Sequence, residues 1–439
     1  MSDQQVEQEH PVTPLELYFD LVFVFAFTQV TTLLSDDPTW GGLGRGLLIL
    51  AALWWAWAGY AWLTNTVNPD EGAVWGAMLV AMAAMFVAAL AVPDAFGHHA
   101  LVFGAAFLIV NLMHIALFVL AGRGDADLLA AVLRIAPSTL AGAALIIGAA
   151  FVHGAVRAMF WLAALAVGYF APLLGGMSGW RVHPAHFVER HGLILIIALG
   201  ESLVAIGLGA RGTGIGAGVI VAAVLGFVVA TSFWLAYFDF FPMRGRQMLE
   251  ERRGEARTAL ARDAYTYLHL PMVVGIVLFA LAMKETLAHV GDELDTIPAL
   301  GLCGGSALYL FAYVALRLRL SRTVGRGRFA AAVVFVLLLP VALAVPALVA
   351  LALTAAVDRA ARVRDHLVAR GSLTDPRIAR ARLRFLTGRS SLEDGKQGLD
   401  LVRAVVPRTI HIEGRRAIYA TPYAAHEVLA NPLSMDMLG

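Results

Sequence analysis

The feature that most constrains this chain is its series of apolar blocks, each about 17–25 residues long, the length that crosses a hydrocarbon core as one helix. Hydrophobic residues fill 59% of the 439 positions and charged residues only 15%, a balance unlike that of water-soluble domains. We therefore predict an all-α, polytopic membrane helix bundle of about 11–12 spans. Ten of these spans are expected at residues 15–34, 43–63, 73–92, 100–121, 128–150, 158–174, 191–208, 216–238, 268–283 and 298–316.

The number of spans depends on residues 329–357, an apolar block that contains Pro340 and Pro346. Proline kinks or ends a helix, so this block can form one long kinked span or two short ones. Arginine helps to decide, because cytoplasmic loops retain positive charge. With a cytoplasmic N-terminus, the inner segments hold Arg123, Arg134, Arg181, Arg190 and the stretches 244–262 and 317–328. An arginine-rich tail on the same side requires an even number of spans, which favours twelve.

Three regions follow from this pattern. Residues 1–14 are predicted to be a cytoplasmic segment with no removed signal peptide, and residues 15–357 the transmembrane domain. Residues 358–439 are predicted to be an arginine-rich, partly disordered cytoplasmic tail, in which 378–386 can form a basic helix and 408–420 a small hairpin.

The first and seventh spans share a layout. Residues 15–29 and 187–201 each place an acid near the start of an apolar run and a polar group deep inside it. Helices six spans apart run in the same direction, as corresponding helices of a parallel repeat do. We therefore predict two parallel six-helix halves, 15–180 and 181–357.

Charged side chains within the spans are candidates for a functional site, because each costs at least ~2.5–3.5 kcal/mol in hydrocarbon unless it pairs or faces a polar path. In the first span Glu16 and Asp20 share a helical face with Thr31, whereas Gln29 points away. The two acids are interpreted either as partners of arginines from the inner loops or as groups that bind a transported ion.

The seventh span carries the deepest carboxylate. Glu201 lies about ten residues into the apolar run, hence ~15 Å along the helix and near the bilayer midplane. Ser202 belongs with Ala198, Ala205 and Gly209 to a stripe of small residues that permits close helix packing. We predict that this short, glycine-interrupted span is a discontinuous helix at a transport site, with a structural salt bridge as the alternative.

Imidazoles crowd the start of the same span. His183, His186 and His191 lie beside Glu189 and Arg190. Such groups can hold a divalent metal, but their order matches neither the paired-histidine zinc helix nor a zinc finger. An interfacial cap is the favoured interpretation of the histidines, and no cofactor is expected. Glu189 and Arg190 join the candidates for ion binding.

Four segments resemble the bacterial low temperature requirement A (LtrA) family, namely residues 13–26, 186–202, 234–239 and 265–272. The resemblance extends from about residue 11 to residue 357. It implies a bacterial multi-pass protein of the inner membrane, associated by name with growth in the cold, and supplies no substrate or catalytic set. Asn111 stands where the resemblance leads us to expect an arginine before His114.

The leading interpretation is a transporter or channel for an ion or small solute that uses Asp20 and Glu201. An intramembrane enzyme for lipid or isoprenoid substrates, with His186, Glu189 and His191 at the inner interface, is the alternative. No aspartate-rich diphosphate motif or nucleophile elbow supports it. A sensor or scaffold is the third class. The expected partners are the bilayer and a small ion or solute, with no nucleic acid, and a homodimer stays open.

Overall fold

The computed structural model describes residues 12–70, 72–211 and 214–373, which form α-helices and no β-strand. Ten helical segments of this described part are long and apolar enough to cross a membrane, which confirms the predicted polytopic bundle. The helices are α1 (Pro14–Asp36), α2 (Trp40–Thr64), α3 (Gly72–Ala91), η1 (Val92–Asp94), α4 (Ala100–Ala121), α5 (Ala126–Ala149), α6 (Gly154–Leu174), α7 (Pro184–Gly209), α8 (Ala217–Phe238), α9 (Phe241–Glu250), α10 (Gly254–Ala261), η2 (Arg262–Tyr267), α11 (His269–Ala288), α12 (Thr296–Ser321), α13 (Arg326–Ala342) and α14 (Ala347–Leu373).

Capping residues fix where the first helix begins. The Thr13 hydroxyl accepts a hydrogen bond from the Glu16 backbone N–H, and the Glu16 carboxylate accepts one from the Thr13 N–H. This reciprocal pair satisfies two amides at the helix start, and Pro14 at the first helical position cannot donate one. The cap thereby holds Glu16 in the first turn of α1.

Side-chain and loop contacts give the direction of each helix. We call the end of the bundle at which α1 begins the proximal end and the end at which it finishes the distal end. Asn65, just past α2, bonds the backbone of His183 at the start of α7, so both lie at the proximal end. Ser35 near the end of α1 bonds Glu285 near the end of α11, so both of these helices finish at the distal end.

The last apolar block forms two helices, α13 and α14, separated at residues 343–346. Ala347 and Leu348 donate backbone hydrogen bonds to Asp292 and Val290 in the distal loop between α11 and α12. Because α13 starts near the proximal end of α12 and finishes beside this distal loop, it crosses the bundle. α14 then starts from the distal end. Neither α13 nor α14 is among the ten helices of the described residues that are long and apolar enough to cross a membrane, so the choice between eleven and twelve spans stays a prediction.

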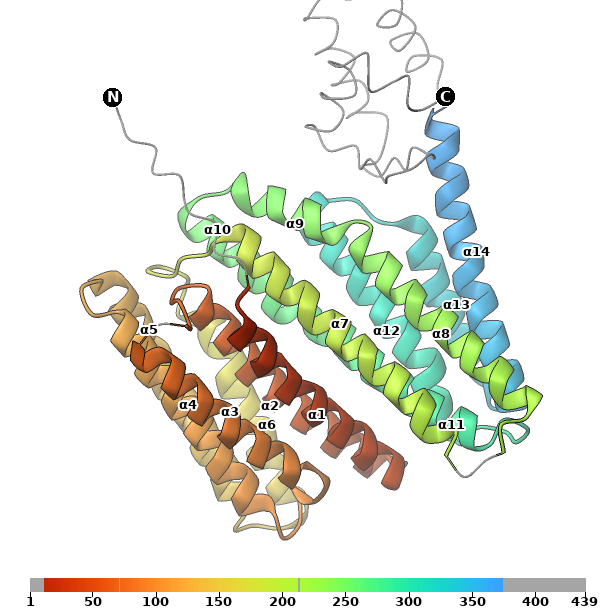
Figure 1. Ribbon diagram of the computed structural model, residues 1–439, viewed down its shortest axis with the longest axis horizontal. Coiled ribbons are helices and arrows are strands. Elements are labelled where there is room, and N and C mark those ends of the chain that lie inside the picture. The colour runs from red at the N-terminus through yellow and green to blue at the C-terminus, as the bar shows by residue number, and fades with distance from the viewer. Residues whose placement is uncertain (1–11, 71, 212–213, 374–439) are drawn as a thin grey trace, which may run out of the picture. The chain divides into compact units, whose positions relative to one another are not determined.

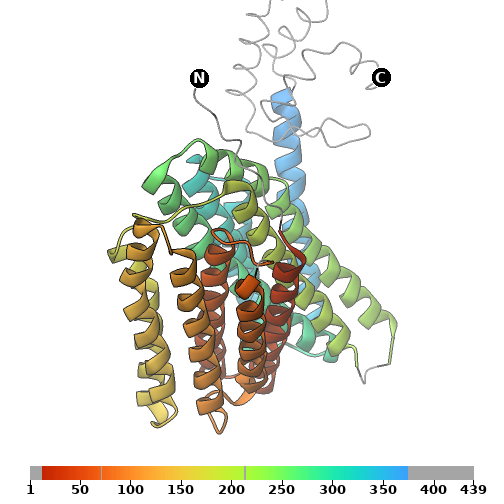
Figure 2. The ribbon, with the colours of Figure 1, turned by 60° about the vertical axis from the view of Figure 1, so that its left-hand side comes forward.

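α1 lies at the centre of the arrangement. Figures 1 and 2 show the red to yellow helices α1–α6 beside the green to cyan helices that begin with α7. α1 packs against α2 and α3 on one side and against α7 and α11 on the other. The contacts between α1 and α7 advance in the same direction along both helices, so these two helices are parallel. The predicted division at residue 180 into two parallel halves stays a prediction, because residues 1–357 form one compact unit.

Our prediction that the seventh span is a discontinuous helix is wrong, because α7 is continuous over 26 residues. The helix also begins at Pro184 rather than at His191. A glycine costs a helix only about 1 kcal/mol, which burial of one helix face offsets. An added Cβ at Gly200 or Gly207 would meet nothing within 4 Å, whereas one at Gly209 would lie 2.4 Å from the Lys284 carbonyl oxygen. Gly209 therefore serves the close approach of α7 to α11.

The chain divides into two compact units, residues 1–357 and 358–439. All the contacts described below belong to the first unit. The predictions for residues 1–11 and for the tail segments 378–386 and 408–420 lie outside the described residues.

Candidate functional site

A buried cluster of charges joins α1 to α7 at the proximal end. The side chains of Glu16, Asp20 and Arg190 are completely buried, and His186 is nearly so. Helical geometry places Asp20 one turn beyond Glu16 on the same face of α1. Because α7 starts with Pro184, Arg190 falls in its second turn, level with that face.

Arg190 is bound to both acids. Its Nη1 donates to Asp20 Oδ2 over 2.8 Å and to the Glu16 backbone oxygen over 3.0 Å. Its Nε lies 3.4 Å from Glu16 Oε1. The partner of the two acids is thus Arg190, one of the arginines that the sequence analysis placed on the inner side, and it lies within helix α7 rather than in a loop.

His186 completes the surroundings of Glu16. Its Nε2 lies 3.1 Å and 3.2 Å from the two carboxylate oxygens, and its Nδ1 lies 3.1 Å from Asn65 Nδ2. The Asn65 amide is oriented by the His183 backbone, whose N–H donates to Oδ1 over 2.8 Å. Since Nδ2 can only donate, Nδ1 of His186 accepts, and a neutral His186 donates from Nε2 to Glu16. Two carboxyl groups then face one guanidinium.

α2 supplies a second contact to Asp20. Trp57 Nε1 donates to Asp20 Oδ1 over 2.9 Å, and the Arg190 guanidinium lies 5.8 Å from the centre of the Trp57 ring. Sequence reasoning missed Trp57 and Asn65. An indole in an apolar span looks like a packing residue, and only the fold shows that α2 faces the charge cluster.

Glu201 lies in the interior of the bundle, away from the proximal cluster. The residue is completely buried, and its Oε2 accepts a hydrogen bond of 2.5 Å from the Thr28 hydroxyl of α1. Its Oε1 and the neighbouring Ser202 hydroxyl have no hydrogen-bond partner among the described residues. No arginine, lysine or histidine of the described chain lies within ion-pair distance of Glu201, and Lys284 acts on it only from beyond that range.

A third polar contact lies toward the distal end of α1, where Ser35 donates to Glu285 Oε1 over 2.7 Å. Polar groups therefore follow α1 from its start to its finish. We call this set the α1 polar seam, and it consists of Glu16, Asp20, Thr28 and Ser35 with their partners Arg190, His186, Glu201 and Glu285.

Other candidate residues lie elsewhere. Glu189 is exposed and makes no part of the seam. His191 is buried among aromatic rings, 5.0 Å from the centre of Trp57 and 5.0 Å from that of Tyr265. His183 contributes its backbone to Asn65. No group of three histidine, cysteine or acidic side chains within the described ranges could hold a metal ion, so the weak metal candidates His183, His186 and His191 do not converge.

A bundle of this kind, with charges buried between parallel helices and apolar side chains exposed outside, defines a multi-pass helical membrane protein. A family model described as bacterial low temperature requirement A protein (LtrA) matches residues 11–361. The chain belongs to this bacterial family, which confirms the resemblance found in the sequence.

One relative is a protein of Rhizobium meliloti (strain 1021) that carries the description uncharacterized. It is 30% identical over 307 residues, which cover 67% of this chain and 74% of that protein. No solved structure matches the chain. The comparisons thus give the family and its bacterial origin, and the chemistry has to be argued from the site.

Proposed function

We propose that this protein transports an ion or small solute across the membrane along the α1 polar seam. The observation that carries the proposal is Glu201, a completely buried carboxyl group that meets the hydroxyl groups of Thr28 and Thr31 and has no cation within ion-pair distance among the described residues. An isolated negative charge is strongly disfavoured in such surroundings. The carboxyl group therefore functions with a proton or a bound cation, which it can take up and release.

The spacing of polar groups along α1 supports a route. Thr28 is eight residues beyond Asp20, hence ~12 Å along the helix, and Ser35 is ~11 Å beyond Thr28. Asp20 and its neighbours form the proximal station, Glu201 the middle one and Glu285 the distal one. Two carboxyl groups against one guanidinium leave the proximal station able to accept a further proton or cation. Three stations at these intervals make a stepwise path between the two ends.

The enzymatic alternative has less support from the geometry. It requires His186, Glu189 and His191 to face one substrate, but His186 faces Glu16, Glu189 is exposed and His191 packs among aromatic rings. These side chains point to three different environments. Transport therefore remains the better proposal.

Flux in liposomes that contain only this protein tests the proposal. We expect an imposed pH gradient, or a gradient of Na⁺ or K⁺, to relax faster than in protein-free liposomes of the same lipid. A pH-sensitive dye and cation-sensitive dyes in the lumen measure the three fluxes separately. Equal rates with and without protein for all three ions would reject a proton or alkali-cation path.

We further propose that the proximal end faces the cytoplasm of the bacterial inner membrane, because arginine gathers at that end. In a Cys303→Ser background, single cysteines at the exposed distal positions His98 and Gly291 should react with an impermeant thiol reagent in spheroplasts. A cysteine at the exposed proximal residue Arg253 should react only after lysis. Labelling of the proximal site in sealed cells would reverse the orientation.

A further inference from the structure

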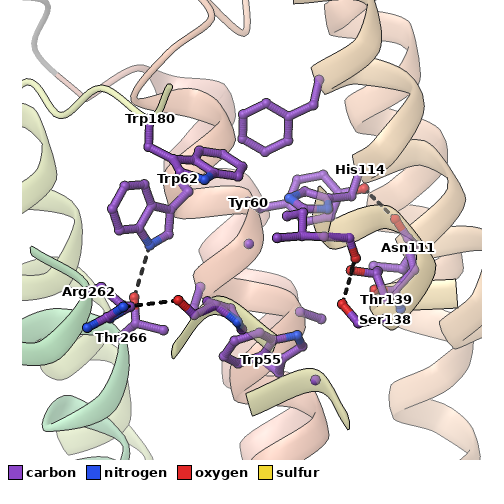
Figure 3. A pocket seen from close by; sticks show the side chains of 18 of the residues that line it. Trp55, Tyr60, Trp62, Asn111, His114, Ser138, Thr139, Trp180, Arg262 and Thr266 are labelled. Atoms are coloured by element: carbon purple, nitrogen blue, oxygen red, sulfur yellow. Dashed lines mark hydrogen bonds between the residues drawn. The ribbon is translucent and has the colours of Figure 1, made fainter. Parts of the chain in front are cut away.

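A second candidate site, a partly open cavity, lies beside α2, apart from the α1 polar seam. A cavity of about 80 Å³ is bounded by α2, α4, α5, α6, the segment before α7 and η2, with no residue of α1 or α7 in its wall (Figure 3). One water needs only about 10–15 Å³. The cavity thus has room for a small organic group, and its chemistry can be derived from its wall.

Aromatic rings form much of this wall. α2 contributes Trp55, Tyr60 and Trp62, α4 contributes Phe118, and the segment before α7 contributes Trp180. Trp180 packs edge-on against Trp62 and Phe118, with ring centres 5.9 Å and 5.2 Å apart. Rigid flat surfaces that are already packed against each other favour a flat, apolar body over a flexible chain.

Hydrogen-bond acceptors gather on the side formed by α4 and α5. The Ser138 and Thr139 hydroxyls both donate to the Ile135 carbonyl, which leaves their oxygen lone pairs available. Asn111 Nδ2 donates to the Phe107 carbonyl, and no described residue donates to its Oδ1. A ligand that carries a hydroxyl or N–H group can donate to these oxygens.

One more polar group of the wall is unsatisfied. His114 is nine-tenths buried, and its Nε2 has no hydrogen-bond partner among the described residues. It lies against Gly59, where an added Cβ would approach Nε2 to 3.0 Å. A buried nitrogen without a hydrogen-bond partner destabilises the folded protein, because it has lost its hydrogen bond to water. A ligand or a water that bonds to this nitrogen would remove that cost.

The charges of the wall favour a neutral ligand. No carboxylate lines the cavity, and Arg262 is the one arginine or lysine in its wall. Its Nε and Nη2 donate to Asp263 Oδ1, and its Nη1 donates to the Pro172 carbonyl over 3.0 Å. A charged ligand would therefore lack a free counter-charge in a poorly solvated space, at a large cost.

The wall also contains an irregular helix. Arg262 and Thr266 belong to η2, a six-residue π-helix, and π-helical turns are frequent at functional sites. The π-helix is held by indoles, since Trp62 Nε1 donates to Thr266 Oγ1 over 2.9 Å and Trp54 Nε1 to the Thr266 carbonyl over 2.8 Å. The π-helix is an observation independent of the cavity volume, and it indicates a functional site in the same part of the bundle.

From these features we infer that the cavity is a binding site for a small, neutral, ring-containing molecule with a hydrogen-bond donor, such as an alcohol or phenol. The ring stacks among Trp55, Tyr60 and Trp62. The donor group bonds to the oxygens of Asn111, Ser138 or Thr139. Binding does not require Glu201, so the inference stands or falls separately from transport.

Three probes with the same ring but different charge test this inference: benzyl alcohol, benzoate and benzylammonium. Titration of the purified protein in nanodiscs should give a saturable change of tryptophan fluorescence with benzyl alcohol. We expect the two charged probes to bind at least about tenfold more weakly, which corresponds to 1.4 kcal/mol. Equal binding of either charged probe, or no saturable signal with benzyl alcohol, would overturn the inference.

Filling the cavity gives the matched variant. Ser138→Leu should weaken benzyl alcohol binding at least about tenfold, whereas Thr231→Leu, at a half-buried threonine of α8 that does not line the cavity, should leave it unchanged. If Ser138→Leu proves unstable, Gly168→Ala replaces it, because its Cβ would lie 3.3 Å from Trp55 Nε1 and narrow the cavity. Unaltered affinity in a folded cavity variant would place the probe elsewhere.

Discussion

Replacing Arg190 with methionine is expected to lower the free energy of unfolding by ~3–5 kcal/mol, because the change leaves two buried carboxyl groups without their cation. Arg190 is completely buried, and it lies 2.8 Å from Asp20 and 3.4 Å from Glu16. Methionine retains much of the apolar volume, so packing loss contributes less than the unpaired charge. Thermal unfolding in detergent, followed by the loss of monodisperse protein, measures the effect.

Arg181→Met is the matched control. Arg181 also pairs with an acid, Asp125, over 2.7 Å, but its side chain is 69% exposed. Exposed ion pairs contribute 0–1 kcal/mol, so this variant should unfold close to the wild type.

A triple variant separates charge from shape. Combining Arg190→Met with Glu16→Gln and Asp20→Asn removes every charge of the group, and replacing a whole buried ion group is often close to neutral. The triple variant should therefore regain part of the stability lost in Arg190→Met. If Arg190→Met alone unfolds like the wild type, the cluster is not a buried ion pair and the register of α7 against α1 is wrong.

The bundle itself could be predicted from the sequence, because apolar length is a local property. Each of the ten predicted spans forms a helix close to its expected place, whereas the twelve spans favoured by the arginine pattern stay a prediction. Helix ends were less predictable. Apolar blocks show where the hydrocarbon begins, whereas a helix continues past it: α7 starts at Pro184, seven residues before the predicted span.

The partners of the candidate site could be predicted only in part. Glu16, Asp20, Glu201 and Arg190 stand out because charge is expensive in an apolar helix. Their pairing is not local, since α1 and α7 are separated by about 170 positions and their rotation about their axes depends on the whole bundle. Thr31, which we placed on the acidic face of α1, lies near Glu201 together with Thr28, and the sequence did not indicate that Thr28 donates to this carboxyl group. Uncharged partners such as Thr28 do not stand out in an apolar span, so they can be identified only once the fold is known.

The test of Glu201 is the one that separates a transport group from a structural one. Glu201→Gln keeps the size of the side chain and an oxygen that can accept from Thr28, but it can no longer take up a proton or balance a cation. We expect the folded variant to lose at least about tenfold in flux, equivalent to 1.4 kcal/mol or more in the barrier, in the liposome assay. Glu189→Gln supplies the control, because Glu189 is an exposed carboxylate of the same helix.

The thermal stability of the Glu201→Gln variant decides how its flux is interpreted. Since no cation lies within ion-pair distance of Glu201 among the described residues, removing its charge leaves no partner unpaired, and the unfolding temperature should stay close to that of the wild type. Low flux with wild-type stability assigns Glu201 to the path. A large loss of stability with normal flux per folded molecule would make it a structural group, since the carboxyl group would then be held by a contact that glutamine cannot replace. Wild-type flux together with wild-type stability would remove Glu201 from the path and leave the proximal cluster to carry the ion.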